Sequence, residues 1–199
     1  METAVLIPIK AFGAAKARLR GRLPDDDRAR LARWLAERVV DAARPLPTFV
    51  ACDDDGVADW ATALGAEVLW SPGLGLNGAV DHGVDIVAGK GADHVIISHG
   101  DLPLPADLPS VASPGRVVLV PDGRRDGTNV LGRPCDVPVP ASYGASSFRV
   151  HLGHALASGA PVSVRLDPRL SIDIDTVEDC RHPLVVPVLA PVLGEAMPQ

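Results

Sequence analysis

The chain has 199 residues, of which 47% are hydrophobic and 22% charged, so it can bury a sizeable core within one compact domain. Its formal net charge of −6 argues against a broad electrostatic surface for nucleic acid. The sequence has no apolar run of about eighteen residues and no signal-peptide pattern at its N-terminus, so we expect no membrane span. Three widely spaced cysteines argue against a disulfide framework and favour a reducing cytoplasm.

The first predicted strand is TAVLIPI, residues 3–9, and a cationic loop follows it. That loop, KAFGAAKARLRGRLP, carries Lys10, Lys16 and Arg18. Cations and free backbone N–H groups after a first strand are typical of a phosphate cradle, although a solvated basic turn has the same composition. Aspartates 25–27 then predict the start of a helix whose apolar positions recur every four residues and pack on the sheet.

Two further strands are predicted over residues 48–52 and 67–70. Aspartates 53–55 follow the first of these, and we expect them to cap a helix over residues 57–64 rather than to bind metal. The glycine-rich stretch SPGLGLNGAVDHG leads into another helix. Asn77 at its start is predicted to cap that helix, with a hydrogen bond to a ligand as the alternative.

The stretch HVIISHGDLPL, residues 94–104, predicts a strand buried on both faces that ends shortly before Asp101. Pro103 prevents an immediate helix because proline disfavours helical conformation in the residue before it. A carboxylate at the carboxyl end of a central strand lies where open α/β sheets bind their ligands. A turn or cap aspartate is the alternative interpretation.

A strand over residues 117–121, the turn DGRRDG and a strand that returns from Thr128 come next. In SYGASSF a helix is predicted to begin near Ser146 or Ser147, where serine is ordinarily a cap. The same N–H and hydroxyl groups can bind a carboxylate or phosphate. We interpret His151 and His154 on that helix as packing or hydrogen-bonding residues rather than zinc ligands.

The last predicted strands cover residues 162–166 and 171–175. In the second, SIDID, alternation places Asp173 and Asp175 on one face with Cβ atoms about 6–7 Å apart, close enough to serve the same metal. Thr176 and Asp179 form a predicted capping box for the helix that follows. We predict one domain over residues 1–182 and leave residues 183–199 as a tail of uncertain role.

Alternating strands and helices predict an α/β fold with one doubly wound, mostly parallel sheet. On that frame, IPIK, AKARL, LGLNGAV, GDLPL, DGTNVL, YGASSF and DIDTVED occur in order. Together they resemble the guanylyltransferases that make the phosphodiester precursor of coenzyme F-420, over roughly residues 3–180. The resemblance implies a Rossmann-like nucleotidyltransferase fold of the nucleotide-diphospho-sugar-transferase type. It also implies transfer of GMP from GTP to phosphoenolpyruvate or 2-phospholactate, with release of pyrophosphate.

Roles for individual residues follow from the same resemblance. It implies that Mg²⁺ is held by three carboxylates and that a small phosphorylated three-carbon acid is bound by neutral groups, with a downstream enzyme of F-420 biosynthesis as a candidate partner. The implied metal ligands are Asp101, Asp173 and Asp175. The implied acceptor-binding residues are Thr128, Gly144 and Ser147. The implied GTP-binding residues are Lys10, Lys16, Arg18 and Asn77, and the first three of them are also the implied catalytic residues.

Two other functions fit these residues. The first is another nucleotidyltransferase of the same fold, with a molybdopterin or sugar-phosphate acceptor, which would need a broad acceptor cleft. The second is a non-catalytic nucleotide-binding module, which would have no need of a complete metal site.

Overall fold

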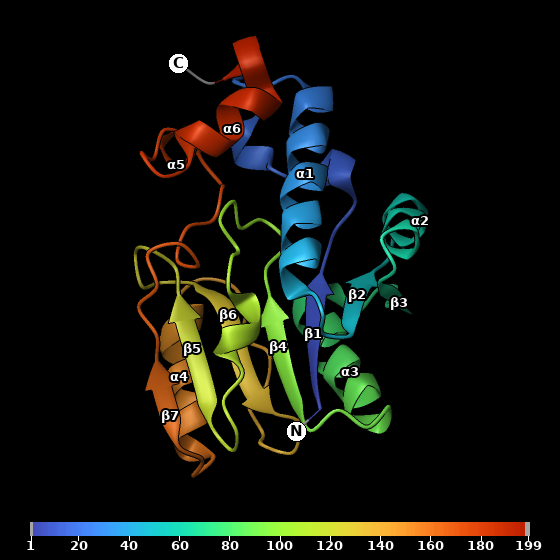
Figure 1. Ribbon diagram of the computed structural model, residues 1–199, viewed down its shortest axis with the longest axis vertical. Helices are drawn as coiled ribbons and strands as arrows, with labels where there is room; N and C mark the ends of the chain where they lie inside the picture. The colour runs from blue at the N-terminus through green and yellow to red at the C-terminus, as the bar shows by residue number, and fades with distance from the viewer. Residues whose placement is uncertain (1, 198–199) are drawn as a thin grey trace.

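The structure, a computed structural model, describes residues 2–197 and contains one seven-stranded sheet (Figure 1). The strand order across the sheet is β3-β2-β1-β4-β6-β5-β7. The strands are β1 Thr3–Pro8, β2 Thr48–Cys52, β3 Glu67–Trp70, β4 His94–Ser98, β5 Val117–Pro121, β6 Thr128–Pro134 and β7 Val162–Val164.

The sheet is mostly parallel, as predicted. β1, β2, β3 and β4 pair in parallel, β7 is parallel to β5, and β6 is antiparallel to both β4 and β5. The chain leaves β1 toward β2 on one side and later returns to place β4 on the other side. The carboxyl ends of β1 and β4 therefore form a topological switch point, where open α/β sheets bind ligands.

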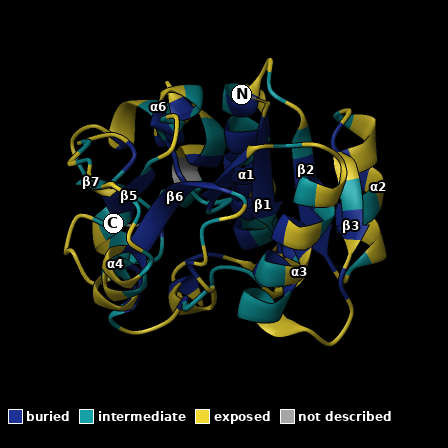
Figure 2. Ribbon diagram, turned by 90° about the horizontal axis from the view of Figure 1, so that it is seen from below, coloured by how far each residue is buried: buried dark blue, intermediate teal, exposed yellow. Residues whose placement is uncertain are grey.

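Helices cover both faces of the sheet, and the strands inside its two edges are buried between them, whereas the edge strands β3 and β7 are partly exposed (Figure 2). They are α1 Asp25–Ala43, α2 Asp55–Ala63, α3 Gly75–Gly89, α4 Ser147–Ala157, α5 Val177–Cys180 and α6 Val186–Leu193. Alternation along β1 divides the core: Val5 and Ile7 pack with α1 and α2, whereas Leu6 packs with α3 and belongs to the cluster that includes α4. The doubly wound prediction is confirmed.

A third apolar cluster lies beyond the carboxyl ends of the strands, where α6 packs beside α1 (Figure 1). It joins Leu31 and Leu35 of α1 to Leu189 of α6 and to the buried Ile174. Short 3₁₀ turns complete the elements: η1 Phe12–Ala14, η2 Ala17–Leu19, η3 Leu108–Val111 and η4 Gly194–Ala196. The stretch that the sequence left unplaced is thus packed against the first helix, up to the last described residues.

The prediction of a strand over residues 171–175 is wrong, because the segment begins in a turn and joins no ladder of the sheet. A single backbone hydrogen bond, from Ile174 N to Asp101 O at 3.3 Å, ties it to the loop after β4. The alternation that suggested a strand nevertheless holds, since Ile174 is fully buried between the two aspartates. β7 is also shorter than predicted and ends at Val164.

Among the described residues, no helix is long and apolar enough to cross a membrane. The division into residues 1–182 and 183–199 stays a prediction, and its residues 1, 198 and 199 lie outside the described part of the chain.

Candidate active site

Three carboxylates converge at the switch point. Asp101 follows β4, and Asp173 and Asp175 flank the buried Ile174. One oxygen from each of the three lies within 4.8 Å of the others. Because Ile174 is anchored in the third apolar cluster, the carboxylates on either side of it face away from that cluster. The predicted convergence of these three side chains is confirmed.

Cations of the first loop reach the same point. Lys16 Nζ lies 2.8 Å from Asp101 Oδ2 and 3.5 Å from Asp175 Oδ1, and an Arg18 nitrogen lies 3.1 Å from Asp175 Oδ2. Lys16 has a left-handed backbone, with φ 55°, which costs a non-glycine residue roughly 1–3 kcal/mol. A lysine in this conformation, paired with two acids of the cluster, indicates a functional site rather than a solvated turn.

The electrostatics of the cluster are asymmetric. Burial raises the pKa of Asp173 to about 7, and the neighbouring Asp101 and Asp175 add to this effect. Burial opposes ionisation of Asp101 too, but Lys16 and His99 outweigh it and lower the pKa of that carboxyl. For Lys16, burial is likewise outweighed by Asp101 and Asp175, so its pKa is raised and the ammonium stays charged. The cluster therefore carries more negative charge than Lys16 alone neutralises.

This donor set suits a hard divalent cation. Carboxylate oxygens are the ligands that such cations prefer. Asp101 Oδ1 is buried and accepts no hydrogen bond from the described residues, which leaves it free for a metal. The structure thus provides an acidic cluster that can hold a divalent metal beside the cationic loop.

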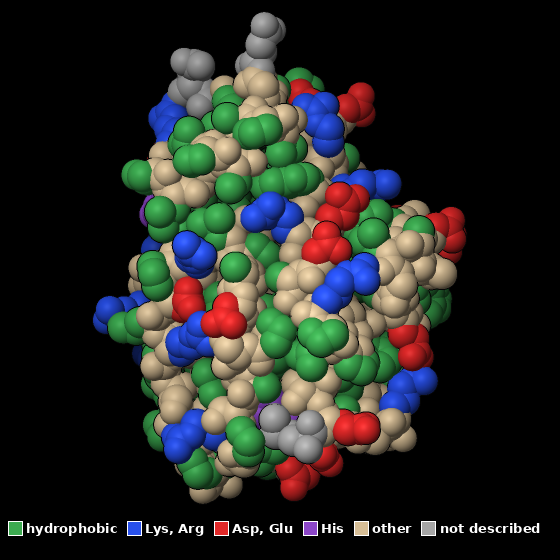
Figure 3. All heavy atoms as spheres, viewed as in Figure 1, with side chains coloured by type: hydrophobic (Ala, Val, Ile, Leu, Met, Phe, Trp, Pro, Cys, Tyr) green, Lys and Arg blue, Asp and Glu red, His purple; other side chains and the backbone are tan. Residues whose placement is uncertain are grey.

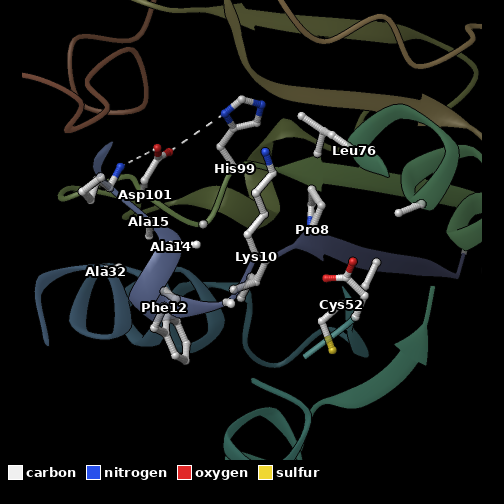
Figure 4. A pocket seen from close by; sticks show the side chains of 18 of the residues that line it. Pro8, Lys10, Phe12, Ala14, Ala15, Ala32, Cys52, Leu76, His99 and Asp101 are labelled. Carbon is white, nitrogen blue, oxygen red and sulfur yellow. Dashed lines mark hydrogen bonds and ion pairs between the residues drawn. The ribbon is translucent and has the colours of Figure 1, made fainter. Parts of the chain in front are cut away.

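A cavity of about 520 Å³ opens beside the cluster (Figure 4). Its lining includes Lys10, Lys16, Asp101 and Asp175, and it continues over the carboxyl ends of β2 and β3. In Figure 4, Asp101 and Cys52 lie on opposite sides of the cavity and Lys10 lies between them. Lys10 is exposed and makes no hydrogen bond or ion pair with the described residues, so its ammonium is available to an anionic ligand.

The predicted acceptor residues lie on the other side of β4. Thr128 begins β6, and its backbone N–H donates to Ser147 Oγ at 3.0 Å. His151 Nε2 accepts from Ser142 N at 2.9 Å, so the proton of the neutral ring is on Nδ1, which donates to Thr128 Oγ1 at 3.0 Å. Burial lowers the pKa of His151 to about 4, with His154 and His99 contributing, and this keeps the ring neutral. The hydrogen-bonding role predicted for His151 is confirmed.

The serine cap predicted for α4 is wrong. Ser146 occupies the cap position with a left-handed φ of 58° and makes no side-chain cap hydrogen bond. Its hydroxyl instead donates to Asp126 Oδ1 at 3.2 Å, and Ser147 Oγ is bonded to Thr128. The two hydroxyls therefore join α4 to the turn before β6.

The cap predicted for Asn77 is also wrong, because Leu74 occupies the cap position of α3. The Asn77 side chain reaches the loop before α4, where Oδ1 accepts from Tyr143 N at 2.8 Å and Nδ2 donates to Tyr143 O at 3.2 Å. Gly144 follows with φ 138°, a conformation that favours glycine. Asn77 and His151 thus hold the two sides of the segment that leads to Gly144. The caps predicted for the other helices are present: Asp54 caps α2, and Thr176 and Asp179 form the capping box of α5.

Two neighbours of the carboxylates were not predicted from the sequence. Asn129 Nδ2 donates to Leu170 O at 3.0 Å and approaches Asp173 Oδ1 at 3.5 Å. His99 lines the cavity, and its ring packs against Tyr143 with centroids 5.0 Å apart and the ring planes tilted by 50°. A signal for Asn129 exists in the sequence, since a polar amide within a buried strand needs partners. His99 lies 3.9 Å from Asp101, two residues along the chain, but its contact with Tyr143 joins distant parts of the sequence and has no local signal.

The fold and this site define a nucleotidyltransferase. A structure from Desulfovibrio desulfuricans G20, provisionally assigned as a nucleotide-diphospho-sugar transferase, matches with a TM-score of 0.77, covers 98% of both chains and is 18% identical. A nucleotidyl transferase from Methanothermobacter thermautotrophicus matches with a TM-score of 0.65, covers 96% of this chain and 99% of its own, and is 16% identical. At these identities the likeness shows the nucleotide-diphospho-sugar-transferase type of fold.

Sequence comparison gives the family. The model of the CofC-like guanylyl transferases matches residues 3–185. The phosphoenolpyruvate guanylyltransferase of Rubrobacter xylanophilus is 36% identical over 188 residues, which cover 90% of this chain and 92% of that protein. The 2-phospho-L-lactate guanylyltransferase of Methanothermobacter thermautotrophicus is 35% identical over 188 residues, which cover 90% and 82% respectively. The chain belongs to the CofC-like guanylyl transferase family, as the motifs in its sequence implied.

Proposed function

We propose that this protein transfers GMP from GTP to the phosphate of phosphoenolpyruvate, or of 2-phospho-L-lactate, and releases pyrophosphate in the biosynthesis of coenzyme F-420. The names of its relatives support these two acceptors. The observation that carries the proposal is the cluster of three carboxylates within 4.8 Å beside a cationic loop and a cavity. A divalent cation held by this cluster would reduce the repulsion between two anionic substrates that must approach each other.

In this proposal Asp101, Asp173 and Asp175 hold Mg²⁺. The metal, when bound, neutralises phosphate charge and orients the reacting groups. Asn129 supports the site because its amide holds both Asp173 and the backbone of Leu170, which fixes the direction of one carboxylate.

Lys10, Lys16 and Arg18 bind the phosphates of GTP. Lys10 is free and lines the cavity, whereas Lys16 and Arg18 are paired with the carboxylates and need only small shifts to contact a phosphate beside them. We assign Asn77 an indirect part, in which it supports nucleotide and acceptor by holding Tyr143 next to the cavity, since both polar atoms of its side chain bond to that backbone.

Thr128, Gly144 and Ser147 bind the carboxylate end of the acceptor. His151 donates to Thr128 Oγ1, so the hydroxyl proton of Thr128 is not needed for that bond. Thr128 and Ser147 are buried and do not line the cavity, so in this proposal the segment before α4 moves to let the acceptor reach them.

The N–H groups of Ser147 and Phe148 at the start of α4 already donate to Gly144 O and Asp126 O, so the positive end of this helix favours an anion through its dipole, by about 0.3–2 kcal/mol, rather than through these two donors. The donors of the acceptor side are neutral, whereas the donors of the first loop are cations. The triphosphate of GTP therefore binds on one side of β4 and the carboxylate of the acceptor on the other.

The chemical step is an in-line displacement. An oxygen of the acceptor phosphate attacks the α-phosphorus of GTP, the bond from that phosphorus to the bridging oxygen breaks, and pyrophosphate leaves along the cationic loop. A phosphate is already ionised at neutral pH, so no general base is required. Positioning by the two sides of the site and stabilisation of charge by Lys10, Lys16 and Arg18 supply the catalysis.

The proposed reaction implies small-molecule partners and a cytoplasmic location, where GTP and three-carbon phospho-acids occur. Acidic and basic side chains are interspersed on the face seen in Figure 3, and the net charge is −6, so this face offers no basic stripe for nucleic acid.

The test is to follow pyrophosphate release from GTP and magnesium with each acceptor in turn. We expect release with phosphoenolpyruvate or 2-phospho-L-lactate, and loss of release when Asp173→Asn replaces the wild type. Activity only with a sugar phosphate or a pterin would contradict the proposed acceptor. Activity that survives removal of magnesium by a chelator would contradict the role of the carboxylates.

A further inference from the structure

One carboxylate of the cavity has no role in the structure described so far. Asp53 comes directly after β2 and lines the cavity. Its neighbour Asp54 caps α2 by accepting from Val57 N at 2.9 Å, so the cap does not need Asp53. Asp53 is exposed and makes no hydrogen bond or ion pair with the described residues. An unpaired carboxylate would repel an anionic nucleotide, so its presence in this cavity needs an explanation.

The position of Asp53 gives that reason. Strands lie about 4.8 Å apart, so the end of β2, two places from β4 in the sheet, is roughly 10 Å from the carboxylate cluster. The cations fix the phosphates near that cluster, which directs the base of the nucleotide toward β2 and β3. There the lining includes Ala51, Leu76 and Ala79, whose small or apolar side chains suit the faces of a planar base. Asp53 lies at the edge of this apolar part of the cavity.

We infer that Asp53 selects guanine, because its carboxylate accepts hydrogen bonds from the N1–H and the 2-amino group of the base. This inference rests on the proposed function and names the group that reads the base of its substrate. Guanine presents two adjacent donors on this edge, which match the two oxygens of a carboxylate. Adenine and cytosine present an acceptor nitrogen next to their amino group, and a carboxylate repels such an acceptor. A site built to bond a donor strongly disfavours a base that lacks it.

The experiment is calorimetric titration of the full chain with GTP, ITP and XTP in the presence of magnesium and without acceptor. ITP lacks the 2-amino group, and XTP has an oxygen in its place. We expect wild type to bind GTP about 10- to 100-fold more tightly than ITP, the range for a hydrogen bond to a charged group. In Asp53→Ala this preference should fall to about threefold or less.

A gain of binding provides a second measurement. In Asp53→Asn the side chain offers one acceptor and one donor, which match the N1–H and the 2-oxygen of xanthine. This variant should therefore bind XTP more tightly than GTP. Asp55→Asn is the matched control, since it removes the same charge from an exposed residue that does not line the cavity, and it should keep the wild-type preference for GTP.

The outcomes separate this inference from the proposed function. An unchanged ratio of GTP to ITP affinity in Asp53→Ala, or an equal loss in Asp55→Asn, would overturn the role of Asp53 even if pyrophosphate is released with a three-carbon acceptor. Selective GTP binding that depends on Asp53, without pyrophosphate release, would support the inference and refute the proposed reaction.

Discussion

Replacing Lys16 by methionine is expected to destabilise the metal-free protein and to increase its response to magnesium. The Lys16 side chain is 5% exposed, and its ammonium lies 2.8 Å from Asp101 and 3.5 Å from Asp175. Methionine keeps an unbranched apolar side chain in the buried space but removes the charge. Asp101, Asp173 and Asp175 would then repel one another without this counter-cation.

The magnitude follows from burial. Removing one partner of a fully buried ion pair costs about 3–5 kcal/mol. The carboxylate side chains of Asp101 and Asp175 are 24% and 41% exposed, so solvent screens the loss and about 1–2 kcal/mol is expected. For a chain of this length, that corresponds to a decrease of roughly 2–8 °C in unfolding temperature. Magnesium should restore the missing charge, and a tenfold tighter site would add about 1.4 kcal/mol of stabilisation.

The assay is thermal unfolding with a chelator and with magnesium, for wild type, Lys16→Met and Lys10→Met. Lys10 is exposed and unpaired within residues 2–197, so its variant is the control and should lie within about 0.5 kcal/mol of wild type. If Lys16→Met were as stable as wild type in chelator, or gained no more than wild type from magnesium, Lys16 would not be the counter-cation of the acidic cluster.

Three further variants test other parts of the site. Asp175→Asn should leave the unfolding temperature nearly unchanged but lower turnover by roughly two orders of magnitude, as loss of one charge-stabilising group does; full activity would show that Asp175 is incidental. Ser147→Ala leaves the buried N–H of Thr128 without its acceptor, so it should lower the free energy of unfolding by about 1–3 kcal/mol. It should also raise the Michaelis constant for the phospho-acid but not that for GTP. Equal effects on both constants would show that Ser147 does not belong to the acceptor site. His151 has a pKa of about 4 when folded and about 6.5 when unfolded, so the unfolded state binds more protons between these values and stability falls as pH decreases from about 6.5 to 4. The free energy of unfolding should be measured by denaturant titration across this pH range. In His151→Gln it should fall less steeply than in wild type, by up to about 1.4 kcal/mol per pH unit. An equal dependence on pH in the two proteins would show that His151 does not titrate in this range.

The parts of the fold that were predicted correctly depend on local pattern. Buried apolar runs identified the central strands, and the carboxyl end of β4 placed Asp101 at the ligand-binding edge. The capping box at Thr176 was readable because both of its partners lie within one turn of helix. In each case, residues close in sequence determine the conformation.

The wrong predictions occur where contacts between residues far apart in the sequence determine the conformation. Alternation in SIDID correctly indicated that Ile174 is buried between two aspartates, but pairing in a sheet depends on a neighbour that the sequence does not reveal. Asn77 bonds to Tyr143, which is 66 residues away, and this contact replaces the local cap that its position suggested. Ser146 likewise bonds to Asp126, 20 residues away, in place of a local cap, and its left-handed conformation is uncommon for serine.

The third apolar cluster links the stretch after residue 182 to the chemistry. Ile174 lies in this cluster together with Leu19 of the first loop, Leu35 of α1 and Leu189 of α6. One set of apolar contacts therefore fixes both the segment that carries two carboxylates and the loop that carries Lys16 and Arg18. A metal site needs its ligands held to a fraction of an ångström, and the segment at residues 171–175 has no strand neighbours to provide that rigidity. We propose that α6 provides this rigidity. Its packing against α1 replaces the missing sheet pairing and holds Asp173 and Asp175 opposite Asp101.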